Sequence, residues 1–321
     1  MARYLLRRIA TSVVLLALVS VLVFVVLRLL PGDPTIARLG VGQSVDPRAV
    51  EELRREMGLD EPILRQYLDW IGGLLRGDLG SSFFSRYSVG TLISQRLAAT
   101  VELAVASLLI GVALALPLAL APALWPRSLV GRAVTAYVTL GMAAPPFIFG
   151  IILIAIFSVE LGWLPVRGYV SLADDPIENL RLLLLPAVTL GITLSAPLIR
   201  YLGGALDEAL RAPYVRTARG KGLSRRDVVV RHALPNALLP ALTALGVMVG
   251  SLLGGVVVVE YVFRWPGMGS LIVDAVLKRD YAVLQTAVLL AAGAFIAANL
   301  VVDLLYGVLD PRLRVTRRRA R

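Results

Sequence analysis

The chain has 321 residues, of which 57% are hydrophobic and only 17% are charged, whereas a soluble domain carries roughly a quarter charged residues. It has no cysteine and one histidine, His232, which excludes disulfide bonds, thiolate metal sites and a multi-histidine metal cluster. The net charge of +11 could indicate nucleic-acid binding. The excess of apolar residues favours a membrane protein, and the distribution of the charges decides between the two.

Six charge-free runs approach or exceed the roughly 20 apolar residues that a bilayer-spanning helix needs. Their interiors contain Gly, Pro, Ser and Thr, which membrane helices tolerate better than soluble ones. The pattern predicts an all-α integral membrane protein with six transmembrane helices. The predicted spans are Ile9–Leu27, Leu103–Leu124, Ala133–Val159, Leu182–Ile199, Ala237–Val259 and Tyr281–Val302.

The positions of Lys and Arg predict the orientation. If the N-terminus is cytosolic, the inner segments contain three basic residues before the first span, two between the second and third, seven between the fourth and fifth, and six in the tail. The two short outer loops contain only five. We therefore expect both termini in the cytosol, and we take the basic residues as topology signals rather than as a nucleic-acid surface.

The segment 31–100, after the first span, is too long for a simple connector. Asp46 and Pro47 form a helix start, with Asp as N-cap and Pro at the first helical position. A second amphipathic stretch runs over 63–75 and ends at the turn 77–80. These two helices could lie on the membrane surface, or they could form a cap that receives a soluble partner; the two interpretations are compatible.

The cytosolic loop 207–236 is the most informative segment. A short helix is predicted from Pro213 through Arg219, because proline suits the first turn, and Gly220 and Gly222 then break it. A second helix is predicted to begin at the capping residue Ser224 and to run until Pro235 marks entry to the fifth span. A loop that merely sets topology would also be basic. The caps and the glycine break favour a docking element instead.

This loop resembles the cytoplasmic signature of ABC importer permeases, EAA-x3-G-x9-I-x-L-P. Ala218, Gly222, Leu234 and Pro235 match at the required spacing. Three positions depart from the general pattern, namely Arg216, Thr217 and His232. The departures resemble the peptide-importer version of the signature, YVRTARAKGL, which appears here as YVRTARGKGL over 214–223.

Other runs extend the resemblance over nearly the whole chain, in order and at family spacing. Together they are similar to the dipeptide/oligopeptide B-type permease subunit. They are LPGDP (30–34), MGLDEPILRQY (57–67), GDLGSSF (77–83), LPAVTLG (185–191), FRWPGMG (263–269), RDYAVLQ (279–285) and DPRLR (310–314).

The resemblance implies a type I ABC importer permease of the bacterial or archaeal plasma membrane. It divides the chain into 1–30 with the first span, an external scoop region 31–100, a five-helix core 101–311 and a basic tail 312–321. It implies an ATPase-coupling site and, on the outside, a docking site for a binding protein. The implied coupling residues are Tyr214, Arg216, Ala218, Arg219, Lys221, Gly222, Leu223, Leu234 and Pro235. The implied docking residues are Asp46, Leu53, Asp78, Arg264, Pro266 and Gly267.

The sequence contains no recognisable catalytic motif. No G-x-x-x-x-G-K-[ST] phosphate loop occurs, so the chain is expected to bind no cofactor, with ATP and Mg²⁺ held by one or two partner ATPases. The resemblance further implies a second, C-type permease subunit and an external substrate-binding protein. The substrate is expected to be a di- or oligopeptide, with nickel chelates, glutathione or sugars as alternatives. A stand-alone secondary transporter is the rival class.

Overall fold

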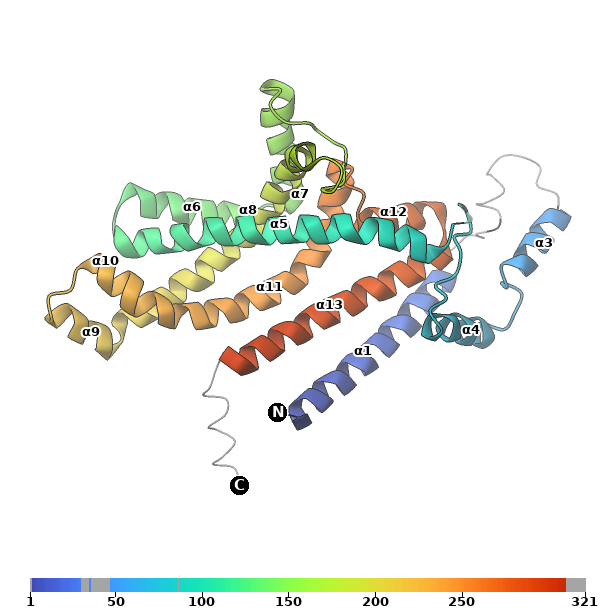
Figure 1. Ribbon diagram of the computed structural model, residues 1–321, viewed down its shortest axis with the longest axis horizontal. Helices are drawn as coiled ribbons and strands as arrows, with labels where there is room; N and C mark the ends of the chain where they lie inside the picture. The colour runs from blue at the N-terminus through green and yellow to red at the C-terminus, as the bar shows by residue number, and fades with distance from the viewer. Residues whose placement is uncertain (1, 30–34, 36–46, 86, 310–321) are drawn as a thin grey trace. The chain divides into compact units, whose positions relative to one another are not determined.

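The computed structural model describes residues 2–29, 35, 47–85 and 87–309, and the regular structure in these ranges is helical (Figure 1). An isolated bridge between Ser81 and Ser88 is the only β pairing that they contain. The all-α prediction is confirmed. The helices are α1 (Ala2–Leu29), α3 (Pro47–Glu56), α4 (Ile63–Leu75), α5 (Val89–Leu124), α6 (Leu129–Ala143), α7 (Pro146–Leu153), η1 (Ile154–Glu160), α8 (Pro176–Arg211), α9 (Pro213–Gly220), α10 (Arg225–Asp227), η2 (Val228–Ala233), α11 (Leu234–Phe263), α12 (Met268–Lys278) and α13 (Tyr281–Leu309).

Five continuous stretches in the described residues are long and apolar enough to cross a membrane. They are 6–29, 89–124, 176–211, 225–250 and 281–300. The predicted third span, 133–159, is different: two helical segments, Leu129–Ala143 and Pro146–Glu160, meet at 111°. The break falls at Ala144, which is extended with ψ 137° because a residue before proline is disfavoured in the helical region. The apolar run predicted as the third span is therefore bent, which its length and hydropathy did not indicate.

The structure divides into two compact units, and each is described by itself. The first comprises 1–100 and 266–296. Its apolar core brings the end of α1, the start of α5, α12 and the first turns of α13 together, with Val89 and Ala287 completely buried. The predicted outer loop between the fifth and sixth spans is therefore largely helical, since α12 occupies Met268–Lys278.

Helices α1 and α4 of this unit are joined by an aromatic and cationic cluster. The Phe24 ring lies 5.2 Å from that of Tyr67, and the Arg28 guanidinium lies 3.6 Å from the centre of the Phe24 ring. Arg28 also donates twice to the Oε1 atom of Gln66, at 3.1 and 2.8 Å. Because cation–π and charged hydrogen bonds act together, the cluster fixes α4 against the end of α1.

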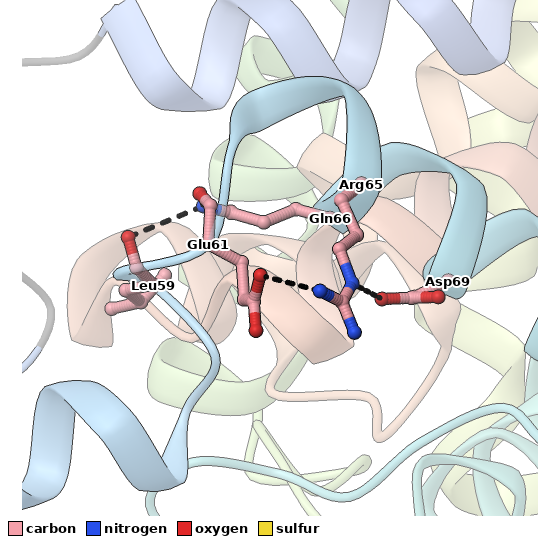
Figure 2. Close-up of polar contacts among 5 residues, drawn as sticks. All are labelled: Leu59, Glu61, Arg65, Gln66 and Asp69. Atoms are coloured by element: carbon pink, nitrogen blue, oxygen red, sulfur yellow. Dashed lines mark hydrogen bonds and ion pairs between the residues drawn. The ribbon is translucent and has the colours of Figure 1, made fainter.

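Gln66 holds the connection before α4 as well (Figure 2). Its side-chain amide donates to the carbonyl of Leu59 at 3.2 Å, while Arg65 lies between Glu61 and Asp69, at 3.2 and 3.9 Å. These ion pairs are exposed and contribute little. The amide of Gln66 matters more, because one side chain joins the α3–α4 connection to Arg28 of α1.

A buried carboxylate organises the loop between α4 and α5. Asp280 is 4% exposed, accepts a hydrogen bond from the Ser82 hydroxyl at 2.5 Å and another from the Phe83 amide at 3.2 Å. The hydroxyl of Ser82 in turn accepts from the amides of Phe84 and Ser85. The segment 82–85 is thus tied to the residue that precedes α13, through groups that are 198 residues apart in sequence.

The second unit comprises 101–265 together with the end of the chain. Helix α8 is its centre and packs against α11, α6 and α7. Small residues allow close approach: a Cβ on Gly191 would lie 2.6 Å from Ile110 of α5, and one on Gly141 would lie 2.6 Å from Ala196 of α8. Such contacts are typical of membrane helices, which associate by packing rather than by hydrophobic exclusion of water.

Candidate ATPase-coupling hairpin

The predicted cytosolic helix pair forms a hairpin in the second unit, which we call the coupling hairpin (213–235). Its first helix, α9, begins at Pro213, as predicted, and ends at Gly220, one residue beyond the predicted end at Arg219. Its second arm begins after Ser224. The Ser224 hydroxyl accepts from the Asp227 amide at 3.2 Å and donates to the carboxylate of the same residue at 2.5 Å. The predicted cap is confirmed.

The second arm does not stop at Pro235. It passes through a π-helical turn, Val228–Ala233, directly into α11, so 225–250 is one continuous apolar helix. Proline lacks an amide hydrogen and its ring collides with the carbonyl four residues earlier in a regular α-helix. The wider π turn relieves that collision. The hairpin and the following span are consequently one element.

A small apolar core lies inside the coupling hairpin. Val215 and Ala218 of α9 pack against Val228 of the second arm, with exposures of 0, 6 and 1%, and Leu210 covers the cluster. Ala218, which matches the family signature, therefore faces the interior of the hairpin. Its small side chain packs between the two arms and contributes little exposed surface.

The turn between the arms requires glycine. Gly222 has φ +80°, a conformation that residues with a Cβ adopt only at a cost. A Cβ built on Gly222 meets nothing within 4 Å. The need for glycine thus comes from the backbone, and the space beside it is open to a partner.

The remaining predicted coupling residues of α9 and the turn share one property, which is exposure. Tyr214 is 42% and Leu223 is 41% exposed. At the far end of the hairpin, Leu234 is half-buried and Pro235 is exposed. Three cations of α9 and the turn are also exposed. The exposed cations are Arg216, Arg219 and Lys221. The hairpin therefore presents a basic surface with two large apolar side chains.

One contact of the coupling hairpin was not predicted from the sequence. The Nε atom of Arg225 donates to the carbonyl of Ala123 at 2.8 Å, near the end of α5 at Leu124. The carbonyls of a last helical turn have no partner within the helix and carry partial negative charge, so a guanidinium suits them. A separation of 102 residues leaves no local signal for this pair.

The predicted outer docking residues do not all reach the surface. In the first unit Leu53 is 8% exposed and Gly267 is also buried, so neither can make a broad contact with a partner. Pro266 is half-buried, and the exposed Asp78 accepts from the Gly80 amide at 2.9 Å.

The two other predicted docking residues are Arg264 and Asp46. In the second unit Arg264 is exposed, with φ 54°, and closes the end of α11. Asp46 lies outside the described residues. Among the predicted docking residues that the structure describes, Asp78 and Arg264 are thus the exposed ones, each within its own unit.

The geometry defines a class first: a multi-pass α-helical membrane protein in which the hairpin 213–235 continues into an apolar span. The family follows from comparison. Residues 89–315 match the family described as "Binding-protein-dependent transport system inner membrane component", and residues 1–104 match its N-terminal companion, "Binding-prot-dependent transport system membrane comp, N-term". The chain belongs to this family. It is a transport subunit and not an enzyme.

Individual relatives cover almost all of the chain. The "Probable peptide ABC transporter permease protein y4tP" of Sinorhizobium fredii is 38% identical over 98% of this chain and 100% of its own length. The "Glutathione transport system permease protein GsiC" of Escherichia coli O6:H1 is 39% identical over 98% and 99%. The resemblance to peptide-importer permeases is confirmed.

Solved structures support the fold at low sequence identity. An inward-facing form of the MetNI methionine ABC transporter matches with a TM-score of 0.56 at 18% identity, over 68% of this chain and 96% of that one. An amino acid ABC transporter crystallised with histidines matches with a TM-score of 0.53 at 16% identity, over 70% and 94%.

Proposed function

We propose that the chain forms half of the translocation pathway of a peptide importer, with a second homologous permease as the other half. ATPase subunits bind the coupling hairpin on the cytosolic side, and a substrate-binding protein docks outside. The observation that carries the proposal is the hairpin itself. It combines an exposed basic and apolar surface with an internal core and two attachments to membrane helices.

These attachments give the hairpin a mechanical role. Its second arm continues without a break into α11, and Arg225 holds the end of α5. Because the Val215–Val228 core makes the two arms one body, a displacement imposed by an ATPase reaches α5 and α11 together. ATP binding and hydrolysis, with Mg²⁺, take place on the partner subunits, and the movement of these two spans alternates the access of the pathway.

Peptides are the substrate class that we propose. The relatives named above are a peptide permease and a glutathione permease, and glutathione is itself a small peptide. Nickel chelates and sugars are the alternatives.

The functional test separates the importer from a stand-alone transporter. The purified chain is expected to hydrolyse no ATP and, in liposomes, to take up no peptide. Both activities should appear when the second permease and the ATPases are added, and both should rise with loaded binding protein. Peptide uptake by liposomes that contain this chain alone, without ATP, would contradict the proposal and support a secondary transporter.

The proposed topology can be tested by cysteine labelling, because the natural chain has no cysteine. Ser81→Cys and Ser171→Cys should react with a membrane-impermeant thiol reagent in intact cells, since these positions lie in segments assigned to the outside. Ser128→Cys and Ser224→Cys should react only after permeabilisation. Labelling of Ser224→Cys in intact cells would reverse the orientation and leave the coupling hairpin on the wrong side for an ATPase.

A further inference from the structure

An open groove of about 760 Å³ lies between the end of α5 and the first turns of α6. Arg127 and Arg132 line it where α6 begins, and Ala136 and Leu140 line it one and two turns further along the same helix. Pro122 of α5 forms part of the other wall. The groove therefore changes from cationic to apolar along the direction in which α6 enters the membrane.

The hydroxyl groups of the groove are already used. Ser128 donates to the carbonyl of Trp125 at 2.7 Å, Thr135 to that of Gly131 at 3.0 Å, and Thr139 to that of Thr135 at 2.9 Å. These hydroxyl protons are thus donated to backbone carbonyls. The two guanidiniums are the strong side-chain donors that remain among the described lining residues.

The two arginines have no internal counter-charge. Within the part of the chain that the structure describes, neither Arg127 nor Arg132 forms an ion pair, and none of the described lining residues is acidic. Arg127 has φ 59°, a conformation that is uncommon for a residue with a Cβ. The turn at Arg127 brings both cations to the same end of the groove.

We propose that this groove binds an anionic phospholipid of the cytosolic leaflet. The guanidiniums of Arg127 and Arg132 take the phosphate, because planar guanidinium donors match phosphate oxygens, and one acyl chain lies along Ala136 and Leu140. Trp125, which is 58% exposed, stands beside the cationic end, as aromatic residues do at the level of lipid head groups. The cytosolic placement rests on the topology of the proposed function.

Lipid binding here would act on the coupling hairpin. The Ala123 carbonyl that accepts from Arg225 belongs to the same end of α5 that borders the groove at Pro122. A lipid that holds this helix end and the α6 turn together supports the attachment of the hairpin. Anionic lipid should therefore increase the rate of transport by a larger factor than it increases the rate of ATP hydrolysis.

The test measures lipid binding to the purified full chain by native mass spectrometry. Dioleoylphosphatidylglycerol is compared with dioleoylphosphatidylcholine for the natural chain, for Arg127→Gln/Arg132→Gln and for Arg211→Gln/Arg226→Gln. The last variant removes two exposed cytosolic arginines outside the groove. The natural chain and this control should prefer phosphatidylglycerol by roughly tenfold to thirtyfold, at about 1 kcal/mol per cation, and the groove variant should lose the preference. An unchanged preference in the groove variant, or equal loss in the control, overturns the proposal.

Further measurements distinguish the lipid from other possible occupants of the groove. Ala136→Trp fills the exposed apolar part of the groove and keeps both arginines, so it should weaken phosphatidylglycerol binding; if the double groove variant fails to fold, this variant decides alone. Inorganic phosphate should not displace the lipid. Displacement by phosphate with no effect of Ala136→Trp identifies an ion site and overturns the proposal. Loss of the second permease from the groove variant, with lipid preference intact, identifies a subunit interface and also overturns it. These readouts need no transport, so they stand apart from the test of function.

Discussion

Gly222→Val is expected to abolish peptide uptake and to reduce retention of the ATPase subunits severalfold, while the chain remains inserted and abundant. Gly222 has φ +80°, and a Cβ in the left-handed region costs roughly 1–2 kcal/mol. No described atom lies within 4 Å of the added Cβ, so the substitution disturbs the turn and its outer surface rather than the interior. The measurement is co-purification with tagged ATPase, together with uptake.

Gly220→Ala is the matched control for this experiment. Gly220 lies two residues earlier, also with open space at its Cβ, but it ends α9 without a positive φ. Alanine is favoured over glycine in a helix, so uptake and ATPase retention should stay near the natural level. Full uptake and full retention in Gly222→Val would mean that the segment sets topology only, and that coupling takes place elsewhere.

Arg225→Gln is expected to separate ATPase binding from transport. The variant loses the bond from Nε to the Ala123 carbonyl, and hydrogen bonds to charged groups contribute about 1.5–3 kcal/mol. The Val215–Val228 core and the Ser224 cap are untouched, so the hairpin stays folded and the ATPases stay bound. Uptake should fall by about tenfold or more, since 1.4 kcal/mol corresponds to a factor of ten.

Arg226→Gln is the control, because it removes the neighbouring exposed cation from the same arm. It should keep both uptake and ATPase retention. Parallel loss of ATPase retention and uptake in Arg225→Gln would show that Arg225 acts at the docking surface. Full uptake in that variant would show that α11 alone transmits the movement.

The local parts of the coupling hairpin could be predicted from the sequence because they depend on neighbours along the chain. Proline at the start of α9, glycine at the turn and serine before α10 each satisfy a backbone requirement within about four residues. Most of the spans followed in the same way from the length of apolar runs. Hydropathy could not locate the 111° bend in the third span, because apolar residues continue through it.

Tertiary structure alone decided which side chains of these helices are buried and which are exposed. No sequence pattern at Ala218 or Leu53 distinguishes an interior position from an exposed one, yet both are buried. The bond from Arg225 to Ala123 and that from Ser82 to Asp280 join residues 102 and 198 positions apart. The sequence by itself determined the membrane class, the family and the caps, since these depend on composition and on short spacing. Contacts between distant segments depend on how helices pack, and packing is settled only when the whole chain has folded.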